Sequence, residues 1–210
     1  MFGVNNFELF ILSTIIFIIT PGMDTIFVLN KAIGQGKKAG MFSTFGVNAG
    51  ILVHTIFAMV GLSIIIGKSA MAFMIIKYLG ALYLVYLGLV SLFSEGNKIN
   101  LKNGLTGTDS GWSNFKSGLI TNVLNPKVAL FFISFFPQFI NPKEIGSVVP
   151  FIFLGSCYAI MGLIWYSILV YFLSAFSNRL KDNPKFTMYL NKFSGLVFVL
   201  MGLKVAMEKK

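Results

Sequence analysis

The sequence contains few charged residues for its length. Only 11% of its 210 residues are Asp, Glu, Lys or Arg, against about 25% in ordinary soluble domains. Hydrophobic residues make up 56% of the chain, and its mean hydropathy is +0.80. Apolar stretches of the roughly 20 residues that cross a hydrocarbon core recur along the whole chain and leave no room for a soluble domain. The composition therefore predicts an all-α, polytopic membrane protein that forms one domain over residues 1–210.

Acidic residues are scarcer than basic ones. Seven Asp and Glu stand against 17 Lys and Arg, which gives a net charge of +10. A basic balance can indicate nucleic-acid binding. Here the basic residues lie mostly between the apolar stretches, as they do in loops that face anionic lipid and the cytoplasm. The expected partner is therefore membrane lipid, and nucleic acid is not expected.

Cysteine is nearly absent. The single Cys157 lies within an apolar stretch, which excludes an intramolecular disulfide, a CxxC redox pair and a thiolate metal cage. The chain also lacks an HExxH motif, a GxSxG motif and a close pair of acids. No enzyme activity and no cofactor is therefore expected.

Six hydrophobic segments are long enough to span a bilayer as helices, the only open-chain structure that satisfies its own backbone in lipid. They cover residues 7–29, 41–66, 70–93, 113–140, 147–174 and 188–205. A long polar connection, residues 94–112, divides them into two sets of three. The first set forms a repeat at about 5–93, and the second forms a repeat at about 113–210.

The two sets share an order of features. A shift of 105 residues places Pro21 on Pro126 and Gly50 on Gly155. Because each set has an odd number of spans, the second set enters the membrane from the opposite face. The expected architecture is six transmembrane helices in a 3+3 inverted-topology repeat, with helices 1 and 4 broken at Pro21 and Pro126. Many secondary transporters are built in this way.

The Lys and Arg residues of alternate loops predict the orientation. The first, third and fifth connections carry ten of them: Lys31, Lys37, Lys38, Lys98, Lys102, Lys116, Arg179, Lys181, Lys185 and Lys192. The opposite side carries six: Lys68, Lys77, Lys143, Lys204, Lys209 and Lys210. By the positive-inside rule, both termini are expected outside.

The first break, in the run FIITPGMDTIFVL, places a carboxylate beside a helix breaker. Pro21 and Gly22 interrupt the helix and free backbone groups that lipid cannot satisfy, so the break implies an internal site. Asp24 at membrane depth needs a cation or a proton as its partner. The alternative is that Asp24 lies at the membrane interface and caps the helix that follows Pro21.

The second break, in the run TNVLNPKVALFF, contains Asn125, Pro126 and the cationic Lys127. Helix ends at such a break can bind charged groups. A carboxylate, an ammonium group and amide side chains together suit a zwitterion, which predicts an amino-acid-like ligand. The alternative for Lys127 is that its side chain extends to a lipid headgroup.

Four further polar residues are weaker candidates for the same site. Asn30, Asn48 and Asn122 supply amide groups, and His54 can exchange a proton near neutral pH. A lone histidine in an apolar segment is more often a hydrogen-bonded packing residue. Packing is therefore the favoured interpretation of His54.

Three runs resemble a known family: ITPGMDTIFVLNKAIGQGKKAGMFSTFGVNAGILVH, IKYLGALYLVYLG and FKSGLITNVLNPKVALFFISFFPQFI. From about Phe7 to the C-terminus, the chain is similar to the lysine-exporter (LysE/RhtB-type) translocators of bacteria. The resemblance implies a multi-pass inner-membrane exporter of amino acids or close derivatives, driven by the proton motive force. It points to Pro21, Gly22 and Asp24 in the motif TPGMD and to Asn125, Pro126 and Lys127 in the motif LNPK.

The leading expectation is thus a secondary exporter that carries an amino acid in exchange for protons. A metal or other cation exporter is the alternative, because acids and amides can bind hard cations. One intramembrane acid, one His and one Cys are few ligands for a metal cage, so no metal site is expected. The sequence does not fix which amino acid is carried, and it leaves a homo-oligomer open.

Overall fold

The computed structural model describes residues 2–68, 70–93, 109–144, 146–172 and 184–207. The described chain is built from helices, with one isolated β-bridge between Val4 and Ile140. Most of the predicted linker, residues 94–108, lies outside the described residues, as do the basic residues Lys98, Lys102, Arg179, Lys181, Lys209 and Lys210.

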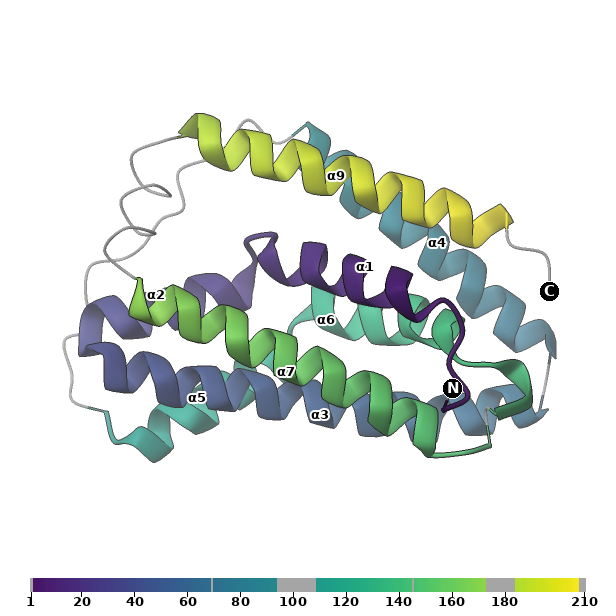
Figure 1. Cartoon of the computed structure of the whole chain (residues 1–210), viewed down its shortest axis with the longest axis horizontal. Helices are drawn as coiled ribbons and strands as arrows, with labels where there is room; N and C mark the ends of the chain where they lie inside the picture. The colour runs from purple at the N-terminus through teal and green to yellow at the C-terminus, as the bar shows by residue number, and fades with distance from the viewer. Residues whose placement is uncertain (1, 69, 94–108, 145, 173–183, 208–210) are drawn as a thin grey trace.

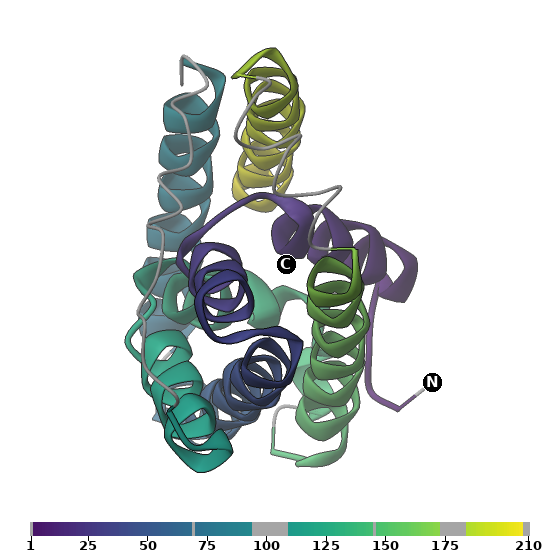
Figure 2. The ribbon, with the colours of Figure 1, turned by 90° about the vertical axis from the view of Figure 1, so that its left-hand side faces the viewer.

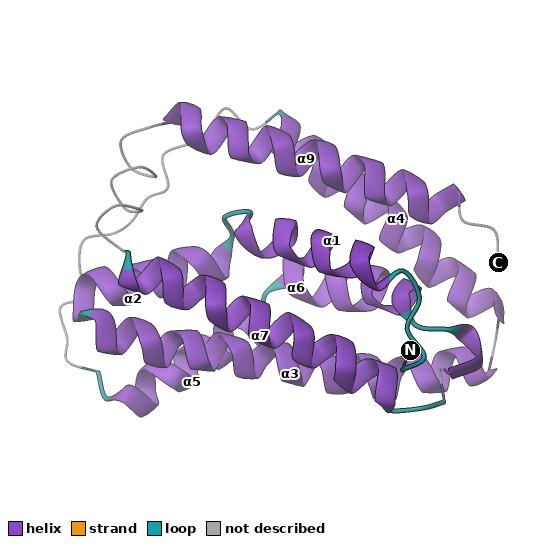
Figure 3. Ribbon diagram, in the orientation of Figure 1, coloured by secondary structure: helices purple, strands orange, loops and turns teal. Residues whose placement is uncertain are grey.

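The described residues form two bent helix pairs and four longer helices, together with short helical turns (Figures 1 and 3). The bent pairs are α1 (Phe7–Ile19) with α2 (Met23–Gln35), and α5 (Gly111–Val123) with α6 (Pro126–Leu130). The longer helices are α3 (Lys37–Lys68), α4 (Ala70–Leu92), α7 (Val149–Tyr171) and α9 (Pro184–Met207). Short helical turns follow α6: η1 (Phe131–Phe135), η2 (Phe136–Phe139) and η3 (Pro142–Glu144).

Both predicted breaks are present: α1 and α2 bend by 50° at the first, and α5 bends by 50° against Pro126–Phe139 at the second. Pro21 lies between α1 and α2, because a proline has no N–H for the preceding turn and its ring clashes with that turn. Pro126 is the first residue of α6, the helix position that tolerates proline best. The prolines therefore determine where the two spans are interrupted.

The number of membrane spans agrees with the prediction in part. Two single helices are long and apolar enough to cross a membrane, at Lys37–Gly61 in α3 and Val149–Tyr171 in α7, and the bent pairs raise this number to four. Among the described residues, α4 and α9 contribute only shorter apolar stretches, Tyr78–Leu92 and Asn191–Leu200. The count of six spans therefore stays a prediction.

Helices α4 and α9 lie side by side as a layer of their own, over the layer that contains α1 and α6 (Figures 1 and 2). Their backbones approach closely at Gly88, where an added Cβ would lie 2.7 Å from the carbonyl oxygen of Gly195. Helices α3 and α5 approach in the same way, since a Cβ on Gly118 would lie 2.5 Å from the carbonyl oxygen of Ser43. Small residues at such contacts are typical of membrane helix pairs.

Candidate functional site at the two helix breaks

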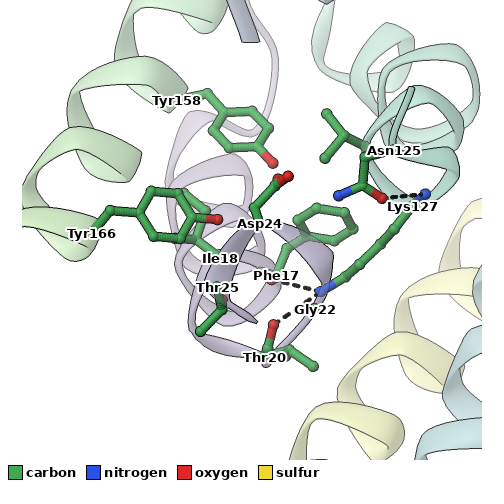
Figure 4. A pocket seen from close by; sticks show the side chains of 11 residues that line it. Phe17, Ile18, Thr20, Gly22, Asp24, Thr25, Asn125, Lys127, Tyr158 and Tyr166 are labelled. Atoms are coloured by element: carbon green, nitrogen blue, oxygen red, sulfur yellow. Dashed lines mark hydrogen bonds between the residues drawn. The ribbon is translucent and has the colours of Figure 1, made fainter. Parts of the chain in front are cut away.

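The first break leaves carbonyl groups of α1 without helix donors. In a continuous helix the Phe17 carbonyl would accept a hydrogen bond from residue 21, but Pro21 has no N–H. The ammonium group of Lys127 takes this role, since its Nζ lies 3.1 Å from the carbonyl oxygens of both Phe17 and Thr20 (Figure 4). It also lies 4.4 Å from the centroid of the Phe17 ring. Lys127 therefore points into the protein and not toward a lipid headgroup.

The second break has the same deficit at the matching position. The Asn122 carbonyl would accept from residue 126, which is again a proline. It accepts instead from the backbone N–H of Asn125 at 3.0 Å and lies 3.1 Å from Nε2 of His54. A carbonyl oxygen can only accept, so the bonded Nε2 of His54 carries a proton. The Asn125 side chain caps α6 by accepting from the backbone N–H of Lys127 at 3.0 Å.

Asp24 lies in the first turn of α2, and only 5% of it is exposed. Its Oδ2 accepts a hydrogen bond from the side-chain amide of Asn122 at 2.9 Å, and the side-chain amide of Asn125 also lies beside the buried carboxyl group. The N-cap of α2 is Gly22, and no side chain caps this helix. Asp24 is thus buried and does not cap the helix, in contrast to the interfacial alternative.

The two breaks are joined crosswise. Lys127 from the second break bonds the last turn of α1, and Asn122 from the last turn of α5 bonds Asp24 beyond the first break. Asp24 and Lys127 do not pair with each other, because the one ion pair within the described ranges joins Lys31 to Asp109. The site therefore holds two opposite charges whose direct partners are neutral groups.

A small cavity of about 10 Å³ lies between the breaks. Its lining residues are Phe17, Ile18, Thr20, Gly22, Asp24, Thr25, Asn125, Lys127, Val128, Tyr158 and Tyr166. Figure 4 shows the hydroxyl groups of the two tyrosines, both from α7, directed toward Asp24. The volume is at the lower limit for one water molecule, so the site is closed in this conformation.

Four of the predicted site residues line the cavity, namely Gly22, Asp24, Asn125 and Lys127. Pro21 and Pro126 form the breaks, while Asn122 and His54 lie behind the lining and connect to it by the hydrogen bonds above. Asn30 and Asn48 lie outside the lining, and the amide of Asn48 donates to Thr44 of its own helix at 2.8 Å.

Sequence reasoning missed the contribution of α7. Tyr158 and Tyr166 lie within the hydrophobic run that forms this helix. Two hydroxyl groups within such a run were the available signal, because a buried tyrosine hydroxyl usually needs a polar partner. Their proximity to Asp24 depends on how α7 packs, which the sequence does not give.

A polar network closes the bundle at the end of α2. Lys31, which is 5% exposed, donates to Oδ2 of Asp109 at 2.8 Å, and Gln35 donates to the same oxygen at 2.9 Å. Asn114 of α5 donates to Oε1 of Gln35 at 3.1 Å. The hydrogen bond from Lys31, followed by that from Gln35, lowers the pKa of the Asp109 carboxyl. The network ties the end of α2 to the beginning of α5.

The N-terminal segment closes the opposite end (Figure 1). The backbone N–H of Asn5 donates to the carbonyl of Phe139, and the N–H of Asn141 donates to the carbonyl of Gly3, both at 2.8 Å. These two bonds flank the bridge between Val4 and Ile140. The site between the breaks is therefore covered from both ends.

Comparison with known proteins identifies the family. The family model of the LysE type translocator matches residues 15–209. The chain belongs to this family. A LysE type translocator is a membrane transporter and not an enzyme, as the sequence predicted. Among the described residues, no group of three His, Cys, Asp or Glu side chains is placed to hold a metal ion.

Similar proteins occur in several bacteria. The translocator is 33% identical to a leucine efflux protein of Enterobacter sp. (strain 638), over 98% of this chain and 97% of the relative. It is 30% identical to a leucine efflux protein of Salmonella choleraesuis, over 98% of this chain and 96% of the relative. An uncharacterized membrane protein, YrhP of Bacillus subtilis, is 33% identical to the chain, over 91% of this chain and 93% of the relative. No solved structure matches the chain significantly.

Proposed function

We propose that this protein exports amino acids or close derivatives in exchange for protons, and that it prefers neutral, apolar side chains. The observation that carries the proposal is the pair of opposite charges, Asp24 and Lys127, beside two broken helices in one cavity. Their arrangement matches the ammonium and carboxylate groups of a zwitterion, and broken helices commonly form such sites in transporters. The relatives that are named leucine efflux proteins support a leucine-like substrate.

Asp24 receives the substrate ammonium group in this proposal. Its Oδ2 accepts a hydrogen bond from Asn122, and the side-chain amide of Asn125 lies beside the carboxyl group, so the substrate ammonium group would bind the remaining acceptor positions of Asp24. The carboxylate lies toward Lys127, whose ammonium has three donors, two of them directed at the Phe17 and Thr20 carbonyls. The first-turn N–H groups of α2, which no side chain caps, add donors on the same side.

The remaining walls select the substrate side chain. The apolar lining comes from Phe17, Ile18, Val128 and the ring of Tyr158. Asp24 is the one acid among the lining residues. A cationic side chain would therefore be buried without a second carboxylate, which is costly, whereas a leucine-like side chain would meet apolar surface.

Exchange at Asp24 couples export to the proton gradient. An ionised carboxylate at membrane depth needs compensation. In the loaded carrier the substrate ammonium compensates Asp24, and in the empty carrier a proton does so. The carrier can then cross between its two conformations loaded with substrate or with a proton, but not with a bare carboxylate, and this restriction produces exchange.

Alternating access requires the closed site to open at one end at a time. The cavity of about 10 Å³ is too small for any amino acid. Opening at one end separates Lys31 from Asp109, and opening at the other separates the N-terminal segment from residues 139–141. The described conformation thus corresponds to the closed state between the two open ones.

The six-span, 3+3 inverted repeat within one domain belongs to the same proposal. In its support, the α1–α2 and α5–α6 pairs run in opposite directions (Figure 1). Helices α4 and α9, with 23 and 24 residues, are each about 35 Å long, enough for a core of about 30 Å. The proposed location is the bacterial inner membrane with both termini outside, so reporter fusions after Lys38 should be cytoplasmic.

The test is transport by purified protein in liposomes. Labelled L-leucine, L-lysine and L-glutamate are each supplied with and without a pH gradient. We expect gradient-driven movement of L-leucine above the other two. Asp24→Asn, which keeps the shape and removes the charge, should abolish it.

The control variant is Glu8→Gln, which neutralises an exposed acid in the first turn of α1. It should transport as the unmodified protein does. Gradient-coupled transport by Asp24→Asn at the level of Glu8→Gln would contradict the site. Transport of none of the three amino acids by the unmodified protein would contradict the substrate class.

A further inference from the structure

The carbonyl groups at the end of α1 form a cluster of electron-rich atoms. The Phe17 carbonyl lacks a helix donor because residue 21 is proline, and the Thr20 carbonyl follows in the non-helical segment. The face of the Phe17 ring is directed at the same ammonium group as the two carbonyls. Unwound carbonyls and the C-terminal ends of broken helices are the groups with which secondary transporters coordinate Na⁺, and an aromatic face also attracts a cation.

In this protein a side chain occupies the cluster. The Lys127 Nζ lies 3.1 Å from each of the two carbonyl oxygens and 4.4 Å from the ring centroid. Lys127 comes from the other broken pair, and its stem passes Gly22, where an added Cβ would lie 3.5 Å from Cδ. No carboxylate of the described residues lies within ion-pair distance of it. Its ammonium group is therefore held by carbonyls, as a bound metal cation would be.

We propose that Lys127 is a built-in cation that fills the position of a coupling Na⁺, so that the transporter has no Na⁺ requirement and the proton is its coupling ion. The statement that the proton is the coupling ion rests on the proposed function, whereas the statement that Lys127 fills a cation position does not. The tethered ammonium satisfies the carbonyl groups at the break and holds the end of α1 to α6. It does so without the binding step that a free ion would need.

The first test measures thermal unfolding of the purified protein and needs no substrate. NaCl replaces choline chloride at constant total salt, and methylammonium chloride is tested in the same way. The unmodified protein should show no difference among the three salts. Lys127→Ala exposes the carbonyl cluster, so Na⁺ or methylammonium at several times its Kd should raise the Tm by about 2 to 4 °C over choline.

Two further variants separate charge from folding. Lys127→Gln keeps one amide donor for the cluster, so it serves the same test with a smaller loss of stability. Lys116→Gln removes an exposed lysine of α5 that lies over Trp112, and it should respond like the unmodified protein. Absence of a cation-specific rise in both Lys127 variants would overturn the inference, as would a Na⁺-specific rise in the unmodified protein.

The second test measures transport of labelled L-leucine in liposomes. Transport by the unmodified protein should be equal in Na⁺ and choline media, whereas Lys127→Gln should recover activity at least about threefold when Na⁺ replaces choline. Na⁺-dependent transport by the unmodified protein would overturn the inference. If L-leucine is not transported at all, the proposed substrate fails, and the unfolding measurements still decide the role of Lys127.

Discussion

The two helix breaks solve one problem with different chemistry. Each proline removes the donor that the carbonyl four residues earlier would use, at Phe17 in the first pair and at Asn122 in the second. The first carbonyl is met by the charged Lys127 and the second by His54 together with the N–H of Asn125. The first break thus depends on one long side chain from the other pair. At the second break, the Asn122 carbonyl has two hydrogen-bond partners.

The helices that begin after the two breaks, α2 and α6, also differ in their N-terminal capping. Helix α6 has the side chain of Asn125 at its N-cap, whereas Gly22 leaves α2 without one. Free N–H groups at the start of α2 are available to a ligand, and those of α6 are partly used. In the proposed function, the first break therefore supplies open N–H groups and Asp24, whereas the second break supplies Lys127 and has its own backbone groups satisfied.

Removal of the Lys127 ammonium should have the largest effect on this comparison. Lys127→Met fills the space but leaves two carbonyl groups unpaired, at about 1–3 kcal/mol for each buried unsatisfied group. We expect a loss of stability of about 2–6 kcal/mol and no measurable L-leucine transport. Unfolding in mixed detergent measures the first and liposome transport the second. Lys116→Met is the matched control, and equal stability of the two variants would contradict the role of Lys127 at the first break.

Removal of His54 should have a smaller effect. In His54→Phe the Asn122 carbonyl still accepts from Asn125, so the expected loss is about 1 kcal/mol, the net value of a typical hydrogen bond. His54→Gln can still donate to the carbonyl and should lose less. The same unfolding measurement applies. A loss as large as that of Lys127→Met would show that the second break is not doubly satisfied.

Replacement of Pro126 should change the effect of removing His54, because both residues determine how the Asn122 carbonyl is satisfied. Pro126→Ala restores an N–H four residues after Asn122, so His54 becomes less important there. In a double-mutant cycle with His54→Phe we expect a coupling energy of at least about 0.5 kcal/mol. Additive losses of stability would indicate that His54 acts through its packing and not through the carbonyl.

The smallest effect is expected at the polar network beyond the first break. The pKa of Asp109 is lowered from its ordinary value of 3.8, first by the hydrogen bond from Lys31. A lowered folded-state pKa gives a stabilisation that is present above the ordinary pKa and is lost as the pH falls through the folded value. Asp109→Asn should therefore unfold at a slightly lower temperature than the unmodified protein at pH 7. The difference should shrink as the pH falls below the ordinary pKa of 3.8 and through the lower folded-state pKa, and a difference that grows on acidification would contradict the ion pair.

The sequence predicted the breaks because proline acts locally. Pro21 and Pro126 interrupt helices wherever they lie, and Asp24 in an apolar run needs a partner whatever the fold. The partners themselves depend on packing. Lys127 was expected to meet a substrate carboxylate or a headgroup, and nothing in its local sequence indicates that it reaches the end of α1.

The contributions of His54 and α7 illustrate the same limit. His54 is 68 positions from Asn122 in sequence, and no periodicity indicates that it would face that carbonyl. Tyr158 and Tyr166 line the same cavity as Asp24 because α7 packs across the breaks. The number of spans could be inferred from hydropathy, but whether all six cross the membrane depends on α4 and α9, whose described apolar stretches are short.

The contacts of the N-terminal segment have a practical consequence for work with this protein. Gly3 and Asn5 bond residues 139–141 through backbone atoms alone, so a substitution removes one of these bonds only if it places a proline at a donor position, Asn5 or Asn141. Any bulky group fused near the start of the chain would have to fit beside Glu144, whose side chain already lies against Gly3. Affinity tags and fluorescent reporters for transport assays are therefore better attached after Met207, where the helix α9 ends.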